Sequence, residues 1–233
     1  MWGVYVQSTA GRTFVGAPGI ALFRSPGDVL RTAHPAGRGD RTLELVLSAD
    51  AAEPFTTGAT DTFREQVARV PPHVDLELRS LSRGAARGEV TSLELDERGH
   101  GLIDGLVGGT VAGTPTDRHR ATIDRALEYL AWHFADDADL PTVASHVGVS
   151  PHHLSRLFRA RAGITLSGHR TELRVRAALE RIEHGASDLS AVACDVGFFD
   201  HAHMTSTFRR VLGRTPTHIR RSLGSYVVDR AFA

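Results

Sequence analysis

The feature that most constrains the fold is a short pattern that occurs twice in the C-terminal half of the chain. Residues 143–149 read Val-Ala-x-x-Val-Gly-Val, and residues 192–198 read Val-Ala-x-x-Val-Gly-Phe. Apolar residues at this spacing lie on one face of a helix, and glycine ends a helix readily. In each copy a second helical pattern follows the glycine, and two short helices joined by a tight turn form a helix-turn-helix. The repeat therefore predicts two such modules.

Capping residues set the limits of both modules. Asp139 and Ser150 precede the two helices of the first module, each with a proline in the first turn, where a missing N–H costs nothing. Ser187 or Asp188, and then Asp200, precede those of the second. We predict helix-turn-helix motifs at 139–163 and 187–213, followed by a last helix that starts at Thr215-Pro216.

One long helix is expected between the modules. Residues Ser167–His184 place Leu173, Ala177, Leu179 and Ile182 near one face, and such a helix is about 25 Å long. It would hold the two modules at a fixed separation, which matters because consecutive major grooves on one face of DNA lie about 34 Å apart. Arg174, Arg176 and Arg181 on this helix alternate with glutamates, so we expect a solvated, ion-paired face there rather than phosphate contacts.

The net charge of zero hides an uneven distribution. All 27 basic residues are arginine; residues 1–116 hold 11 arginines against 14 acids, and residues 117–233 hold 16 against 13. Ten of the 13 histidines also lie beyond residue 116. A basic, histidine-rich half beside an acidic half indicates a chain with one nucleic-acid-binding part.

The N-terminal half is predicted to be a small β region followed by helices. Alternating apolar residues over the first fifty positions, ending with the run Leu43–Leu47, indicate short strands. From Thr57 to Val107 the pattern becomes helical, and Thr91 with Glu94 resembles a capping box. The apolar stripe that follows could pack on its own domain or form a dimerisation surface. Gly108–Thr116 reads as a linker.

Several classes of protein are disfavoured. No apolar run approaches the roughly 20 residues that span a bilayer, and the N-terminus shows neither a signal peptide nor an anchor, so we expect a cytoplasmic protein without membrane contact. The single cysteine, Cys194, cannot form an intrachain disulfide, and we expect it to be a small core residue rather than a redox switch.

Motifs for catalysis and for metal binding are also missing from the sequence. It contains no glycine-rich phosphate loop, no Gly-x-Ser-x-Gly elbow and no His-Glu-x-x-His, so we expect no enzyme activity and no cofactor. The pairs His152-His153 and His201-x-His203 do not converge as metal ligands on a helix, and we expect no metal site.

The C-terminal motifs have a family resemblance. The segments Ser150–Phe158, Leu173–Ala178, Ala193–Phe198 and Phe208–Pro216, in unbroken order across residues 117–222, resemble the AraC/XylS family of bacterial transcription regulators. The resemblance implies that each second helix enters the major groove of promoter DNA. It also implies RNA polymerase as a partner, and allows a small-molecule effector and a homodimer.

The resemblance also implies which residues contact DNA. In the first module these are His152, His153, Ser155, Arg156 and Arg159; in the second they are His201, Ala202, His203, Thr205, Ser206, Arg209 and Arg210. Positions 152, 155, 156 and 159 share one helix face, and Arg156 could contact guanine through two hydrogen bonds. Ala202, Met204 and Ser206 depart from the family pattern, so we expect the first module to dominate specificity and the second to bind phosphate through Arg209 and Arg210.

The N-terminal half resembles, more faintly, the cupin-like sensor half of the same family, through Gly19, Pro26-Gly27, His34 and Gly39-Asp40. Arg31 and His34 are its candidate effector-binding residues. The β region is short for a complete barrel. The resemblance leaves open whether an effector binds and whether the protein is an activator or a repressor.

Together these observations predict an α+β fold: a small, partial cupin-like N-terminal β region with helices, then an all-α domain with two helix-turn-helix motifs joined by a long helix. The expected divisions are a sensor and dimerisation region at 1–107, a linker at 108–116, a DNA-binding domain at 117–222 and a tail at 223–233. The predicted function is a sequence-specific transcription regulator. The alternative is a small cupin-type enzyme or sugar-binding protein whose helical tail serves assembly.

Overall fold

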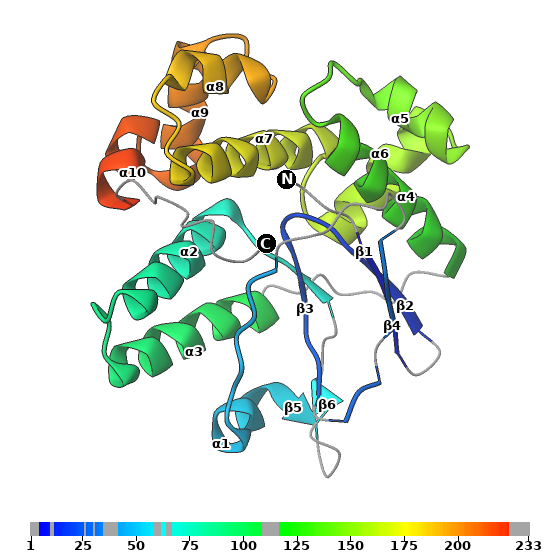
Figure 1. Cartoon of the computed structure of the whole chain (residues 1–233). Helices are drawn as coiled ribbons and strands as arrows, with labels where there is room; N and C mark the ends of the chain where they lie inside the picture. Colours follow the sequence, from blue (N-terminus) through cyan, green and yellow to red (C-terminus); the bar gives the residue numbers. More distant parts are fainter. Residues whose placement is uncertain are drawn as a thin grey trace.

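The computed structural model describes residues 5–9, 12–25, 27–29, 31–34, 42–57, 62–63, 67–108 and 117–223. Short strands, two short helices and two longer helices form the N-terminal part, and the described C-terminal part is helical (Figure 1). The α+β arrangement agrees with the sequence prediction. The predicted linker after residue 108 and the predicted tail after residue 223 lie outside the described residues.

The described strands are short and form three small antiparallel sheets. In the first, β1 pairs with β2 and β4, so that Gln7 lies opposite Phe14 on one side and Thr32 on the other. The second joins β3 to β7, and the third joins β5 to β6. The strands are β1 (Tyr5–Thr9), β2 (Arg12–Gly16), β3 (Ile20–Leu22), β4 (Arg31–Ala33), β5 (Thr56–Thr57), β6 (Thr62–Phe63) and β7 (Val67–Arg69).

Two predictions about the N-terminal half were wrong in detail. Leu43–Leu47 forms no strand: it has no partner strand among the described residues, and Val46 is 89% exposed. Among the described residues after Thr57, the strands β6 and β7 precede the first helix, which begins at Pro72. The alternation of apolar residues cannot show whether a neighbouring strand is available to pair with the segment.

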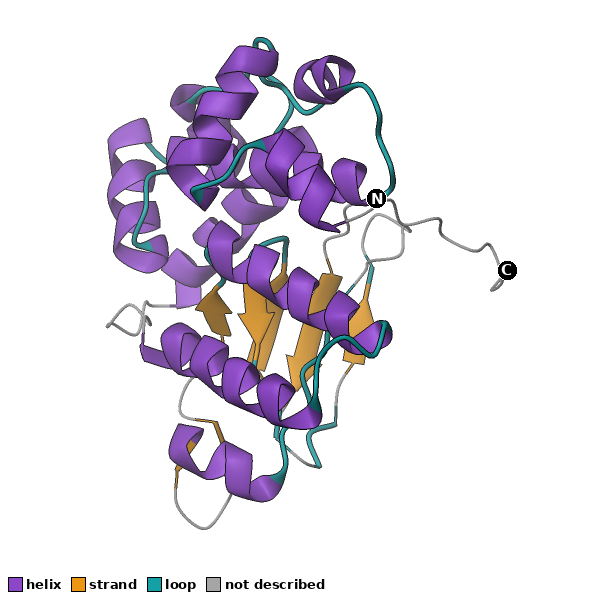
Figure 2. Cartoon of the chain, turned by 90° about the vertical axis from the view of Figure 1, so that its left-hand side faces the viewer, coloured by secondary structure: helices purple, strands orange, loops and turns teal. Residues whose placement is uncertain are grey.

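Two helices, α2 (Pro72–Ala86) and α3 (Ser92–Gly108), cover one side of the strands (Figure 2). The short helices α1 (Ala49–Ala52) and η1 (Glu53–Phe55) precede them. The predicted capping box is present: the Glu94 N–H donates to Thr91 Oγ1 at 3.3 Å, and the Thr91 N–H donates to Glu94 Oε2 at 3.0 Å. The Glu94 carboxylate accepts hydrogen bonds from both the N–H and the hydroxyl of Thr91, and these two bonds lower the pKa of the Glu94 carboxyl.

The apolar stripe on α3 packs within its own half of the molecule. Leu102 and Leu106 join Ala68, Val74 and Leu81 in one buried cluster. Of the two readings of this stripe, internal packing is the one that the structure shows.

The C-terminal part is built from seven helices in the described range 117–223. They are α4 (Asp117–His133), α5 (Leu140–Val147), α6 (Pro151–Ala162), α7 (Leu166–Glu183), α8 (Leu189–Asp195), α9 (His201–Leu212) and α10 (Pro216–Leu223). The two predicted modules correspond to α5–α6 and α8–α9, and α7 is the predicted long helix.

The predicted caps are present in both modules. Asp139, Ser150 and Asp188 accept backbone N–H bonds at the starts of α5, α6 and α8, and Asp200 accepts one from the His203 N–H at 2.7 Å at the start of α9. Gly197 has a φ of 88°, and a Cβ there would lie 2.4 Å from the Ala135 carbonyl oxygen, so this turn requires glycine.

The helix α7 contributes to two apolar cores. Its first turns bring Leu166 and Leu173 into the core of the first module, with Leu154 and Phe158. Its later turns supply Val175, Leu179 and Ile182 to the core of the second module, which includes Phe208 and also Leu76 of α2. The two modules therefore share one helix, and α2 packs against the second of them.

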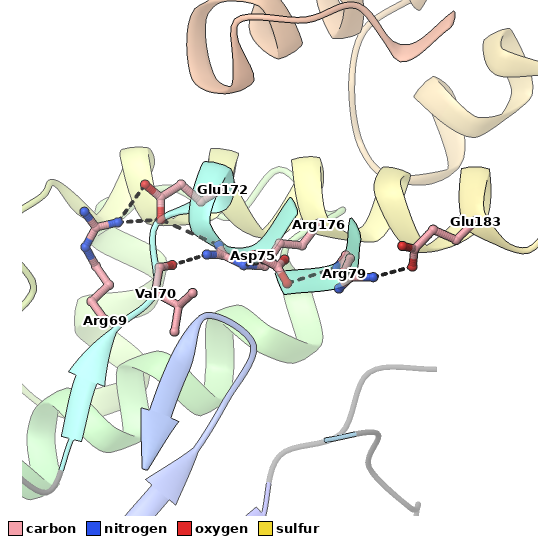
Figure 3. A network of polar contacts seen from close by, with 7 residues as sticks. All are labelled: Arg69, Val70, Asp75, Arg79, Glu172, Arg176 and Glu183. Atoms are coloured by element: carbon pink, nitrogen blue, oxygen red, sulfur yellow. Dashed lines mark hydrogen bonds and ion pairs between the residues drawn. The ribbon is translucent and has the colours of Figure 1, made fainter. Parts of the chain in front are cut away.

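Buried and partly buried ion pairs join the two halves of the molecule along α7 (Figure 3). Arg176 donates to the Val70 carbonyl and lies 3.3 Å from Asp75. Arg69 contacts Glu172 at 2.9 Å, and Arg79 bridges Asp75 and Glu183. Acidic and basic partners therefore come from both halves.

The expected solvated face of α7 is consequently only partly correct. Arg181 does form an exposed ion pair with Asp195. Arg176, in contrast, is 2% exposed, and burial lowers the pKa of its guanidinium while Asp75 and Glu172 oppose that shift. Arg174 donates to the carbonyl oxygens of Phe134 and Asp136. The i, i+4 alternation of charge on α7 could not reveal that α2 and β7 cover part of it.

Candidate nucleic-acid interface

The second helix of the first module, α6, has one buried and one exposed face. Leu154 and Phe158 are fully buried, and they fix the helix against α4, α5 and α7. The other face carries the predicted DNA-contacting residues: His152, Ser155, Arg156 and Arg159 are exposed, and His153 is half-buried. Four of the five predicted residues are therefore exposed enough to contact the major groove of DNA directly.

Arg156 is held loosely. Its Nη2 lies 3.5 Å from His153 Nδ1, at the limit of a hydrogen bond, and neither Arg156 nor Arg159 forms an ion pair with a described carboxylate. The segment Pro151–Ala162 contains no acidic residue. The guanidinium groups on this face are therefore available to an anionic or acceptor-rich partner.

The second helix of the second module, α9, is built in the same way. Met204 and Phe208 are fully buried, and the predicted contact residues Ala202, His203, Ser206, Arg209 and Arg210 are exposed, with His201 and Thr205 half-buried. Arg209 and Arg210 lie in the last turns of α9 and form no ion pair within the described part of the chain.

Local hydrogen bonds occupy several polar groups of α9. The Ser206 hydroxyl donates to the His203 carbonyl at 3.1 Å, and the Phe199 N–H donates to His203 Nδ1 at 3.4 Å. Thr205 Oγ1 lies 3.4 Å from His201 Nε2. These side chains already have partners within α9 and its preceding turn, whereas the two arginines do not.

Sequence reasoning missed Phe199, which is 88% exposed directly before the cap Asp200. Its neighbour Phe198 is buried in the core of the second module. The sequence signal for its exposure is that Phe198 and Phe199 are adjacent in a tight turn, where only one of the two rings can enter the core.

Arginines elsewhere in this half are mostly engaged. Arg125 donates to the Val147 carbonyl, Arg170 to the Ala138 carbonyl, and Arg220 to the Ser187 carbonyl. By contrast, Arg156, Arg159, Arg209 and Arg210 form no ion pair with a described carboxylate, so both second helices carry unpaired positive charge. This is the electrostatic pattern that phosphate binding requires.

Cys194 was placed wrongly. It is exposed on α8, while Val192, Ala193 and Val196 face the core. Within a seven-residue helix the apolar face is narrow, so the position next to Ala193 turns toward solvent.

The candidate effector residues Arg31 and His34 lie at and just after β4 and are exposed. A larger feature lies elsewhere: a cavity of about 860 Å³ between the N-terminal half and α7. Neither Arg31 nor His34 lines it. No group of three or more potential metal ligands occurs among the described residues.

Comparison with known proteins agrees with this geometry. A family model described as a helix-turn-helix domain matches residues 143–222. The arabinose operon regulatory protein of Escherichia coli K12 is 27% identical over 98% of this chain and 81% of its own length. The transcriptional activator RhaS of Escherichia coli O1:K1 is 29% identical over 42% of the chain and 36% of its own length. Residues 143–222 therefore form a helix-turn-helix domain of the AraC type.

The chain is also similar to solved structures. The C-terminal domain of AraT, a response regulator from Geobacillus stearothermophilus, is 26% identical over 52% of this chain and 98% of its own, with a TM-score of 0.44. The curated homologues are transcription regulators and not enzymes. The chain is a transcription regulator with an AraC-type helix-turn-helix DNA-binding domain. None of its described helices is long and apolar enough to cross a membrane.

Proposed function

We propose that this regulator binds specific promoter DNA by placing α6 and α9 in successive major grooves. The observation that carries the proposal is the pair of exposed, acid-free arginine faces on two helices whose cores share α7. Because α7 packs into both cores, the two helices are held in a fixed relation, as binding along one face of DNA requires. The proposed contact residues are the twelve named above.

The first module is proposed to read bases and the second to bind mainly phosphate. Arg156 is exposed near the middle of α6, where its guanidinium could form two hydrogen bonds with guanine. On α9 the hydroxyls of Thr205 and Ser206 have local partners, and Arg209 and Arg210 provide the charge. Phosphate contacts of this kind position a protein without reading sequence.

The proposal also covers the sensor region, its ligand and the protein's partners. The short strands form a sensor region of partial cupin-like character at residues 1–107, and a small-molecule effector binds in this region. RNA polymerase and a second copy of the chain are the proposed partners, as the family resemblance implies. The arabinose operon regulatory protein, whose name refers to a sugar operon, is similar to 98% of this chain, and this supports a regulator with a sensor half.

Selection of duplexes from random DNA tests the proposal, followed by gel shifts over a salt series. We expect a preferred sequence and an affinity that falls with salt, with a slope of about −0.9 per phosphate contact. Arg156→Ala should alter base preference at one position, by about 1–3 kcal/mol. Arg209→Ala should weaken binding to all sequences and reduce the slope by about 1.

The matched control is Arg98→Ala, an exposed arginine on α3 far from α6 and α9 in sequence. It should leave both the preference and the slope unchanged. A slope near zero with no preferred sequence would contradict the proposed function. Loss of discrimination on changes in α9 but not on Arg156→Ala would reverse the ranking of the two modules.

A further inference from the structure

We propose that the cavity between the N-terminal half and α7 binds an uncharged, largely apolar molecule, and that occupancy of the cavity changes DNA affinity through α7. This inference rests on the proposed DNA-binding function. It adds the site and the chemical class of the effector, neither of which the sequence indicated.

The wall of the cavity is mainly aliphatic and aromatic. Its volume of about 860 Å³ lies within the range of small-molecule sites, which are typically 300–1,000 Å³. The apolar lining comes from β3, the segment after residue 42, α2 and α3, and includes Leu22, Phe23, Leu45, Leu78, Leu102 and Leu106. Leu43 and Leu45 are 50% and 40% exposed, so a bound apolar molecule would remove further apolar surface from water.

The charged groups on the wall neutralise one another. Four arginines and four carboxylates line the cavity, and the arginines all pair with carboxylates. Arg24 pairs with Glu44, Arg79 with Asp75 and Glu183, and Arg176 with Asp75. A charged ligand would have to break one of these pairs or remain unpaired in a partly buried site, and both are costly. The wall therefore favours a neutral ligand.

Atoms at the α7 end can still form hydrogen bonds. Asp75 Oδ2 and the Nε and Nη1 atoms of Arg176 are buried and have no hydrogen-bond partner among the described residues, although ion pairs of 3.3–3.6 Å surround them. A neutral ligand group such as a hydroxyl could donate a hydrogen bond to Asp75 Oδ2 and accept one from the Arg176 guanidinium. The inferred ligand has an apolar body and a hydroxyl-like end.

The cavity wall includes the helix that carries both modules. Arg176, Glu180 and Glu183 contribute from α7, and the neighbouring residues Val175 and Leu179 are in the core of the second module. A ligand that hydrogen-bonds to Arg176 competes with its contacts to Asp75 and Val70, which hold α7 against the N-terminal half. Occupancy thus changes the restraint on the helix that positions α6 and α9.

The first experiment measures ligand class on the full chain. Nile red, a neutral fluorophore, reports binding to the cavity, and three ten-carbon competitors differ only in the head group: 1-decanol, decanoate and decylamine. We expect 1-decanol to displace Nile red at concentrations at least tenfold below those of the two charged compounds. Preferential displacement by decanoate or decylamine, or no saturable Nile red binding, would overturn the proposal.

Two variants locate the site. Ser82 on α2 and Ala49 on α1 are exposed residues on the cavity wall, so Ser82→Trp and Ala49→Trp fill the cavity without removing core packing. Each should weaken Nile red binding at least fivefold. Ser92→Trp, an exposed position on α3 outside the lining, is the matched control and should bind as the parent protein does. Equal binding by all four proteins would contradict the site.

The last experiment measures coupling. With the duplex selected above, saturating 1-decanol should change the Kd for DNA at least threefold in the parent protein and in Ser92→Trp, and not in Ser82→Trp. Ligand binding without any change in DNA affinity would overturn the coupling. Absence of DNA binding both with and without 1-decanol would contradict the proposed function instead, and Nile red binding would still test the site.

Discussion

The guanidinium of Arg176 on α7 lies 3.3 Å from the carboxylate of Asp75 on α2, and the arginine is 2% exposed. This pair connects the helix shared by the two DNA-binding modules to the N-terminal half. Desolvation of both charges is costly, so the pair is stable only with its surrounding contacts, which come from Val70, Glu172 and Arg79.

Arg176→Ala should therefore destabilise the protein strongly. The substitution leaves Asp75 with Arg79 as its remaining partner and removes a large buried side chain, and we expect a loss of about 3 kcal/mol in the free energy of unfolding. Urea unfolding measures it. Arg181→Ala removes an exposed pair with Asp195 and should cost less than about 1 kcal/mol. Equal losses in the two variants would contradict the structural role given to Arg176.

His169 should make the protein sensitive to acid. The side chain is fully buried between Phe158 and the arginines of the interface, and burial, with Arg176 and Arg69, lowers its pKa to about 3. The unfolded chain takes up this proton near pH 6.5, whereas the folded chain does so only near pH 3, so stability falls as pH drops through this window.

The comparison that isolates this effect is between the parent protein and His169→Leu. Between pH 7.5 and pH 5.5 the free energy of unfolding should fall by about 1.4 kcal/mol more in the parent than in the variant. This is the value expected because pH 5.5 lies one unit below the pKa of histidine in the unfolded chain. His218→Leu removes an exposed histidine of α10 and is the control for the loss of a histidine side chain as such. A parent and a His169→Leu variant with the same pH dependence would show that His169 is not the group responsible.

Asp124 should show the opposite sign. Burial raises the pKa of this α4 carboxyl to about 6, against the influence of Arg120 and Arg161. The folded chain holds the proton at higher pH than the unfolded chain, so this stabilising contribution is complete below about pH 4 and is lost as pH rises through 6. Asp124→Asn should stabilise the protein at pH 7.5 by about 1 kcal/mol, after allowance for solvent screening, and change little at pH 4.5. Thermal unfolding at the two pH values measures the difference.

The N-terminal cap of α9, Asp200, should contribute to the stability of the protein. Asp200 Oδ1 accepts the His203 N–H at 2.7 Å, and its removal in Asp200→Ala should cost about 1 kcal/mol. Asp200→Asn keeps an acceptor and should recover most of the loss. If the alanine and asparagine variants unfold at the same denaturant concentration, the hydrogen bond contributes nothing measurable.

Local signals made the C-terminal half predictable. Asp139, Ser150, Asp188 and Asp200 lie within a few residues of the N–H groups they cap, so short-range spacing was enough to place α5, α6, α8 and α9. The glycine turns follow the same logic, because a positive φ is a property of one residue.

Features that depend on distant partners could not be predicted in this way. Arg176 and Glu172 look like a solvated i, i+4 pair, but Asp75 and Val70, about a hundred residues earlier, bury the arginine. The signal that was present is the unbroken small and apolar run Ala177–Leu179 next to it, which indicates a helix covered on more than one side. Likewise, Leu43–Leu47 has the alternation of a strand without a partner strand, and its leucines line the cavity instead.

The division of α7 between two cores has a consequence for how such a regulator can change its target. Each residue of an α-helix advances the chain by 1.5 Å and turns it by about 100°. An insertion of one residue between Leu173 and Val175 would therefore rotate the second module relative to the first instead of merely moving it farther away. The angle between the two modules is fixed by the length of a single helix, so in the proposed binding mode the spacing of the two parts of the DNA site can shift only in discrete steps.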